Sequence, residues 1–329
     1  MTGYVVRRLA ASLLLLVLVL TATFFLLHVA PGDPMTVSED QRRMPREHRE
    51  KLRQLYGLDR PLPVQYALWM GSVGRGDWGV SISQGRPVSR VIAEALPATF
   101  LLAGSALAIE YSVALLVGIA AARRRGSAFD HLTRVVSLLL FSQPVFWLGL
   151  MGILLFAYAW PILPASHMRS VDAEEMSALG RLLDLGRHLI LPAAVLGLTQ
   201  AGATARFVRG SLIEVLSQDF IRTARAKGLT ERRVVWVHGL RAALPPLIQL
   251  FALSLPALLG GSLVTEAVFS WPGLGRLTYI AIQSRDYPVI LASTAYSAAI
   301  VLLGNLLADL LLAASDPRVR AAGVGGLRA

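Results

Sequence analysis

The chain contains no cysteine and, for its length, few charged residues. The missing cysteine excludes disulfides, zinc–thiolate sites, iron–sulfur clusters and a cysteine nucleophile, and it says nothing about the redox compartment. Charged residues make up 16% of the 329 residues, whereas a soluble domain carries about 25%. Together with 54% hydrophobic residues and a mean hydropathy of +0.56, this shortfall indicates a membrane protein.

Motifs for covalent chemistry are also missing. The sequence has no Gly-x-x-x-x-Gly-Lys-Ser/Thr phosphate loop, so we expect that it cannot hydrolyse ATP alone. It has six histidines, and no two of them stand at a spacing typical of metal ligands. No Ser-His-Asp order or paired-carboxylate spacing stands out either. We therefore predict no catalytic residue, no bound metal and no cofactor for this chain.

Long apolar runs predict an all-α membrane protein with six transmembrane helices, because a bilayer-crossing helix needs about 20 mostly apolar residues. The predicted spans are Leu9 to Ala30, Phe100 to Ala122, Val135 to Trp160, Leu189 to Val208, Leu244 to Thr265 and Val289 to Ala314. The first span could instead be a cleaved signal peptide, since Arg7 and Arg8 precede it. Its apolar stretch is too long for that and lacks a small-x-small cleavage site, so we expect a retained span.

The distribution of basic residues orients these spans. The connections after the second and fourth spans are rich in arginine, whereas that after the third is slightly acidic and that after the fifth is neutral. The positive-inside rule then places both termini in the cytoplasm. A net charge of +11 would suggest nucleic acid as a partner of a soluble protein. Here the basic residues are dispersed among apolar spans, and we predict no nucleic-acid binding.

This topology divides the chain into four parts. Residues 1–30 form the first transmembrane helix, 31–97 an external loop element, 98–314 a core domain with five transmembrane helices, and 315–329 a cytoplasmic tail. The external element has too few apolar residues to build a core of its own, so we expect a small appendage rather than an independent domain.

The cytoplasmic connection at 214–242 carries the strongest pattern. Phe220, Thr223 and Lys227 recur at three- and four-residue steps, which predicts a short helix. Gly228 can end this helix in a left-handed cap, and a second amphipathic helix then leads back to the membrane. Two short helices at a glycine bend would form a knob that fits a cleft on another protein. The alternative is an ordinary basic loop of a membrane protein.

The run Arg222-Thr223-Ala224-Arg225-Ala226-Lys227-Gly228-Leu229 resembles the coupling loop of the permeases of binding-protein-dependent ABC importers. It is similar to the form in the dipeptide/oligopeptide/nickel permease family. The spacing from Gly228 to Leu244-Pro245 in this chain also matches that family. The glutamate that opens the general superfamily motif is missing, since Arg222 stands there. The resemblance implies that the segment docks on an ATPase subunit through Thr223, Ala224, Lys227, Gly228 and Leu229.

The resemblance extends over nearly the whole chain. The order and spacing of Ala30-Pro31-Gly32-Asp33-Pro34, Gly76-Asp77-Trp78-Gly79 and Phe269-Ser270-Trp271-Pro272-Gly273 match the family. The last of these runs, with Asp286, resembles the family's external loop before the final span, so Trp271, Pro272, Gly273 and Asp286 are expected on the outer side. The long external loop after the first span favours the first of the two permease paralogues.

The family resemblance implies a non-catalytic permease subunit that forms half of a transport path in the inner (plasma) membrane. The implied partners are a second permease (a paralogue), two ATP-binding subunits that use ATP and Mg, an extracytoplasmic solute-binding protein and membrane lipid. Di- or oligopeptides are the expected cargo, with nickel or another small solute as the alternative. A secondary transporter would show an inverted repeat and ion-coupling residues at mid-depth, and no convincing repeat is visible.

Glu110 is the one acid placed deep within a predicted span. Carboxylates inside a membrane are costly and by default suggest a function. Glu110 either lines the transport path, packs against another subunit or makes a local polar contact. Asn305 and Asp309 stand four residues apart and predict a polar stripe against a neighbouring helix.

Overall fold

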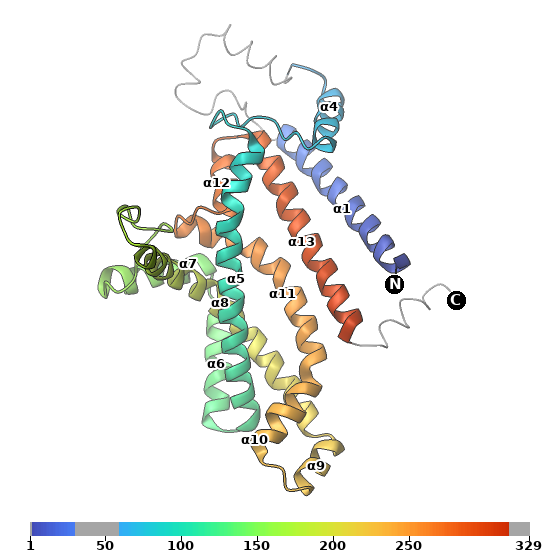
Figure 1. Ribbon diagram of the computed structural model, residues 1–329, viewed down its shortest axis with the longest axis vertical. Helices are drawn as coiled ribbons and strands as arrows, with labels where there is room; N and C mark the ends of the chain where they lie inside the picture. The colour runs from blue at the N-terminus through green and yellow to red at the C-terminus, as the bar shows by residue number, and fades with distance from the viewer. Residues whose placement is uncertain (1, 30–58, 316–329) are drawn as a thin grey trace. The chain divides into compact units, whose positions relative to one another are not determined.

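The computed structural model describes residues 2–29 and 59–315. These residues are almost all helical (Figure 1), and the extended backbone among them pairs in one isolated bridge, between Val80 and Pro87. The helices are α1 (Thr2–Val29), α4 (Leu62–Gly74), α5 (Val88–Arg123), α6 (Ala128–Ser142), α7 (Val145–Ile153), the π-helical turn η2 (Leu154–Ala159), α8 (Ala178–Leu216), α9 (Asp219–Ala226), α10 (Glu231–Arg233), the π-helical turn η3 (Val234–Gly239), α11 (Leu240–Val268), α12 (Leu274–Gln283) and α13 (Tyr287–Ser315). The predicted all-α class is confirmed.

The chain divides into two compact units. Unit 1 consists of Met1–Tyr4, Phe100–Trp271 and Val301–Ala329, and unit 2 consists of Val5–Thr99 and Pro272–Ile300. The long helices α5 and α13 each begin in unit 2 and end in unit 1. Residues 30–58 of the predicted external element and 316–329 of the predicted tail lie outside the described residues.

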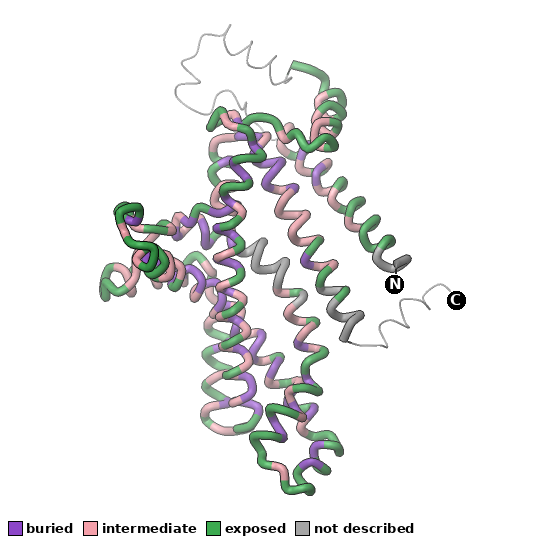
Figure 2. Tube along the Cα trace, viewed as in Figure 1, coloured by how far each residue is buried: buried purple, intermediate pink, exposed green. Residues whose placement is uncertain are grey.

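Helix α8 is the centre of unit 1, where it contacts α6, α7, α11 and η3. Figure 2 shows buried residues recurring along its length. Glycines let the backbones of α5 and α8 approach closely, since a Cβ at Gly118 would lie 2.7 Å from the Ala205 carbonyl oxygen. A Cβ at Gly197 would lie 2.6 Å from the carbonyl oxygen of Ala106. Small residues at such crossings are the usual packing device of membrane helices.

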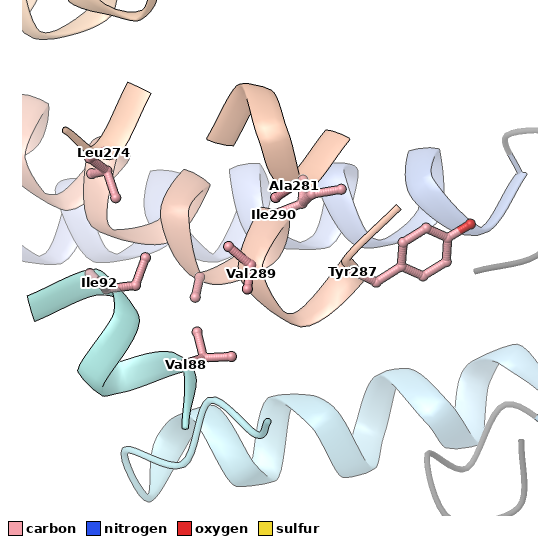
Figure 3. Packing of buried hydrophobic residues seen from close by; sticks show 8 residues of the cluster. Val88, Ile92, Leu274, Ala281, Tyr287, Val289 and Ile290 are labelled. Atoms are coloured by element: carbon pink, nitrogen blue, oxygen red, sulfur yellow. The ribbon is translucent and has the colours of Figure 1, made fainter. Parts of the chain in front are cut away.

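Unit 2 is built on a cluster contributed by three helices. Figure 3 shows Val88 and Ile92 of α5, Leu274 and Ala281 of α12, and Tyr287, Val289 and Ile290 of α13. Helix α1 meets α4 through aromatic rings, since Phe24 stacks on Trp69 with 5.3 Å between ring centroids. The Thr21 and Tyr66 hydroxyls are hydrogen bonded at 2.7 Å. The apolar side chains Leu13, Leu14 and Leu18 of α1 are exposed, as contact with lipid requires.

The described residues contain five helices that are long and apolar enough to cross a membrane, and a sixth segment if one bent pair counts as a span. The five lie in α1, α5, α8, the run from α10 into α11, and α13. Each of them overlaps a predicted span. The molecule is therefore a multi-pass membrane protein.

The bent pair corrects the prediction of one continuous third span from Val135 to Trp160. Helix α6 ends at Ser142, α7 begins at Val145, and the chain direction changes by 100° between α6 and the α7–η2 segment. Pro144 causes the break, because a proline disfavours helical backbone at the residue before it. Gln143 accordingly has φ −86° and ψ 141°. The pair is either a broken span or a re-entrant loop.

Candidate functional site

The predicted knob at 214–242 is present in unit 1 and consists of α9, a glycine turn and α10 with η3, which continues into α11 (Figure 1). Gly228 has φ +74°, in the left-handed region that favours glycine. Its N–H donates to the Arg225 carbonyl oxygen at 2.9 Å, and the N–H of Leu229 donates to the Ala224 carbonyl oxygen at 3.4 Å. The glycine cap predicted from the sequence is confirmed.

The knob has a small core of its own. Ile221 and Val234 are fully buried and pack with Ala224, which is 7% exposed. Leu216 and Leu229 are partly buried against this cluster. The side chain of Ala224 is thus enclosed within the knob, and its part in docking stays a prediction. Ala224 holds α9 against the second helix.

The opposite side of α9 is exposed, and it is named the docking face after the role predicted from the sequence. It consists of Asp219, Arg222, Thr223 and Ala226, which are all solvent-exposed. Lys227 and Gly228 are exposed beside it. Of the residues predicted to dock, Thr223, Lys227 and Gly228 are exposed on or beside this face, whereas Asp219 and Ala226 were not named from the sequence. Their signal was available, since residues 219, 223 and 226 follow the three- and four-residue spacing of one helix face.

An ion pair closes the bend of the knob. The Arg225 guanidinium donates to both carboxylate oxygens of Glu231, at 2.8 and 3.1 Å. These hydrogen bonds raise the pKa of Arg225 above its ordinary value, so the guanidinium stays charged at any physiological pH. Both side chains are close to half exposed, and the pair therefore fixes the geometry of the bend more than it adds stability.

A buried ion pair fixes α8 shortly before it reaches the knob. The Arg209 guanidinium donates to the two carboxylate oxygens of Asp130 at 2.6 and 2.8 Å. The Asp130 side chain is 1% exposed and also accepts from the Gly126 N–H at 2.9 Å. Such a bidentate pair has a defined geometry as well as a strong attraction. It ties the α5–α6 turn and the start of α6 to α8, ten residues ahead of α9.

Glu110 is enclosed within unit 1, where it is 1% exposed. One carboxylate oxygen accepts from the Thr204 hydroxyl of α8 at 2.6 Å. The other, Oε2, has no hydrogen-bond partner within the described residues. On the next residue, the Tyr111 hydroxyl is hydrogen bonded to Ser254 of α11 at 2.9 Å. Of the roles predicted for Glu110, these hydrogen bonds favour a local polar contact. Its role in lining a path stays a prediction.

The residues predicted for the external loop before the last span fall in both units. Trp271 is fully buried in unit 1, and its N–H donates to the Glu266 carbonyl oxygen at 2.8 Å. Pro272 and Gly273 belong to unit 2. Pro272 is exposed, and Gly273 directly precedes α12. In the described part of the chain, no three His, Asp or Glu side chains come together as metal ligands would.

Asp286 is a fully buried acid that joins two distant parts of unit 2. Its Oδ2 accepts from the Ser81 hydroxyl at 2.5 Å and from the Ser83 hydroxyl and N–H at 2.7 and 2.9 Å. Asp286 directly precedes α13, so these bonds attach the turn at 79–87 to the start of that helix. Sequence reasoning named Asp286 but not its serine partners, which are about 200 residues away.

Two family models match the chain. The model "Binding-protein-dependent transport system inner membrane component" matches residues 114–321. The model for the N-terminal part, "Binding-prot-dependent transport system membrane comp, N-term", matches residues 1–103. The first match includes α6 to α11 and so contains the knob.

Curated relatives match over almost their full length. The chain is 39% identical to the oligopeptide transport system permease protein AppB of Bacillus subtilis, over 97% of this chain and 99% of that protein. It is 39% identical to the di/tripeptide transport system permease protein DppB of Pseudomonas aeruginosa and 37% identical to the dipeptide transport system permease protein DppB of Escherichia coli, with the same coverage.

A solved structure shares the fold. A chain of the MetNI methionine ABC transporter in an inward-facing conformation matches 71% of this chain and 96% of its own length, with a TM-score of 0.50 and 21% identity. That level of identity establishes the arrangement of helices and nothing further. The family matches and the near-complete coverage of the relatives carry the assignment: the chain is a permease subunit and belongs to the family of inner-membrane components of binding-protein-dependent transport systems.

Proposed function

We propose that the chain forms half of the transport path of an ATP-driven importer of di- or oligopeptides, and that the knob transmits the motion of the ATP-binding subunits. The peptide cargo is inferred from relatives whose names specify oligopeptides, di/tripeptides and dipeptides. The observation that carries the coupling role is the glycine-capped knob with its own buried core and an exposed docking face.

The proposed complex has five parts: this chain, a second permease that is its paralogue, two ATP-binding subunits that use ATP and Mg, and an extracytoplasmic solute-binding protein. This chain has no catalytic role in it. The knob lies between two long helices, α8 and α11, without a flexible linker on either side. A displacement of the docking face would therefore be passed into the spans as a rigid-body movement.

A charge change on the docking face tests this role. In Thr223→Glu/Ala226→Glu, two exposed positions of α9 become acidic while the buried Ile221 and Ala224 remain. We expect the variant to insert and fold. In a pull-down from detergent it should retain less than about a tenth of the ATP-binding subunit that the wild type retains, because misplaced acidic groups at a complementary interface weaken binding by several kcal/mol.

The matched control is Ala128→Glu, an exposed alanine in the first turn of α6, where an acid suits the helix dipole. It should retain the ATP-binding subunit as the wild type does. Equal retention by the docking-face variant would refute the coupling role. If the wild type itself captured no ATP-binding subunit, the ATP-driven mechanism would fail and a secondary transporter would become the leading alternative.

A further inference from the structure

At the end of unit 1 that carries the knob, the structure has a cavity of about 440 Å³. It lies between the end of α5, the end of α8 and the bend of the knob. Its volume falls in the range of small-molecule sites, which measure roughly 300–1,000 Å³.

The wall formed by the end of α5 is strongly basic. Arg123, Arg124 and Arg125 follow one another at the α5–α6 turn, and Gly126, with φ +80°, closes that turn. Within the part of the chain that the structure describes, none of the three arginines forms an ion pair. Arg124 lies over the Phe129 ring at 5.5 Å from its centroid. The cavity therefore presents three guanidinium groups without an ion-pair partner among the described residues. The one acid that lines it is Glu231, whose pKa is lowered mainly by its hydrogen bonds with Arg225 and to a smaller extent by the charge of Arg123.

The other walls are of a different character. Ile213 and Leu216 of α8 contribute apolar side chains. The third wall carries Arg225 and Glu231, which already bind each other, so the one acid of the cavity is neutralised. A basic rim beside an apolar floor, at the end of two membrane helices, matches an amphiphile with an anionic head and an acyl chain.

We propose that this cavity binds the phosphate headgroup of an anionic phospholipid of the cytoplasmic leaflet. The positive-inside rule accounts for arginines at this end of the spans, but it does not account for a hollow with an apolar floor beside them. Basic pockets between membrane helices on the cytoplasmic side are a known setting for such headgroups. Arginine suits phosphate because its planar fork binds two oxygens at once.

The inference requires that the end of unit 1 with the knob lies on the cytoplasmic side of the membrane. It does not depend on the cargo or on the docking face. A bound lipid would contact Arg225 and Glu231, so the occupancy of the cavity would bear on the bend of the knob. Anionic lipid would then influence how the knob is held, in addition to surrounding the spans.

Native mass spectrometry of the purified transporter complex tests the proposal, with phosphatidylglycerol and phosphatidylcholine offered in equal amounts. The wild type should retain phosphatidylglycerol preferentially. The triple variant Arg123→Gln/Arg124→Gln/Arg125→Gln should bind it about a hundredfold more weakly, since each basic residue near the headgroups contributes about a factor of five. Binding of phosphatidylcholine should not change.

Two further variants separate lipid binding from a fault in insertion. The triple arginine-to-lysine variant keeps the charges that orient the spans but loses the planar forks, and it should bind phosphatidylglycerol with an intermediate affinity. Ala120→Phe keeps every arginine and fills part of the cavity, and it should also weaken binding. The control Arg60→Gln/Arg75→Gln/Arg90→Gln removes three exposed arginines of unit 2 and should leave binding unchanged.

Several outcomes would overturn the proposal. One is unchanged retention of phosphatidylglycerol by the glutamine triple variant, and another is an equal loss in the unit 2 control. If inorganic phosphate or glycerol phosphate displaced the lipid at equal concentration, the cavity would be a site for a soluble anion. If Arg123 cross-linked to an acidic residue of the ATP-binding subunit and no lipid bound, the occupant would be a protein.

Discussion

At the scale of single residues, Asp130 of unit 1 is held by several hydrogen bonds at once. It is held by the Arg209 guanidinium on one side and by the Gly126 N–H on the other, and almost none of it reaches solvent. Removing one partner of a buried ion pair leaves the other charge without compensation, which costs more than the pair contributes when intact.

We therefore predict that Asp130→Asn lowers the unfolding temperature of the purified chain in detergent by about 5–10 °C. Asp130→Asn/Arg209→Gln should lower it less than the sum of the two single variants, because the double variant leaves no charge unpaired. Asp219→Asn breaks an ion pair whose two side chains are exposed, and it should have no measurable effect. If the effect of the double variant equalled the sum of the effects of Asp130→Asn and Arg209→Gln, the two residues would not be coupled.

A second residue-scale prediction concerns the glycine contacts of α5. Gly118→Ala would place a methyl group against the Ala205 carbonyl oxygen and the Val208 side chain, both under 3 Å away. Overpacking of this kind costs about 1–3 kcal/mol, so we expect a lower unfolding temperature.

Gly104→Ala is the matched control, because it lies in the same helix with nothing within 4 Å of the new methyl group. It should be neutral or stabilising by up to about 1 kcal/mol, since alanine favours a helix more than glycine does. Equal unfolding temperatures for both variants would mean that α5 and α8 do not pack at Gly118.

At the scale of elements, the break between α6 and α7 is assigned to Pro144. In Pro144→Ala, Gln143 regains access to helical backbone, and we expect the 100° bend to open toward a straighter segment. Because the chain has no native cysteine, spin labels at Val136→Cys and Tyr158→Cys would be the only ones present. Electron–electron distance measurements should show a longer separation in the alanine variant. An unchanged distance would place the cause of the bend in tertiary packing.

The elements also show how far the sequence could predict this structure. Gly228 and its cap were predictable, because the signal is local and only glycine readily adopts that backbone. The bend was missed although Gln143-Pro144 stands in the printed sequence, since a continuous apolar window was given more weight than the proline. The burial of Ala224 inside the knob could not be predicted, because helical spacing identifies a face but not which neighbour covers it.

Contacts between distant residues lay beyond sequence reasoning altogether. Asp130 and Arg209 both stand in predicted cytoplasmic connections, where charge was counted only to orient the spans. Nothing in their spacing of 79 residues pairs them. The cavity beside the knob likewise brings residues 120–125 against residues 213–231, which the sequence separates by about 90 residues. From the sequence, its three consecutive arginines indicated only an ordinary basic loop.

At the scale of the whole molecule, the predicted orientation places both termini and the knob in the cytoplasm. Single cysteines test it, because labelling by a membrane-impermeant maleimide reports the side of an exposed residue. Ala128→Cys and Ala226→Cys should react only from the cytoplasmic side. Val171→Cys and Arg75→Cys, both at exposed positions, should react only from outside. The reverse pattern would invert the topology and would remove the basis for a cytoplasmic-leaflet lipid site.

The attachment of Asp286 to Ser81 and Ser83 has a consequence for biogenesis. The two ends of this contact are 205 residues apart, so a ribosome that adds about 5–20 residues per second reaches the aspartate roughly 10–40 s after the first serine. During that interval the two serines lack the acceptor that holds them in the finished protein. Unit 2 is therefore completed only after residue 286 has been synthesised, and a chain truncated before that residue would leave it open for quality-control proteases to recognise.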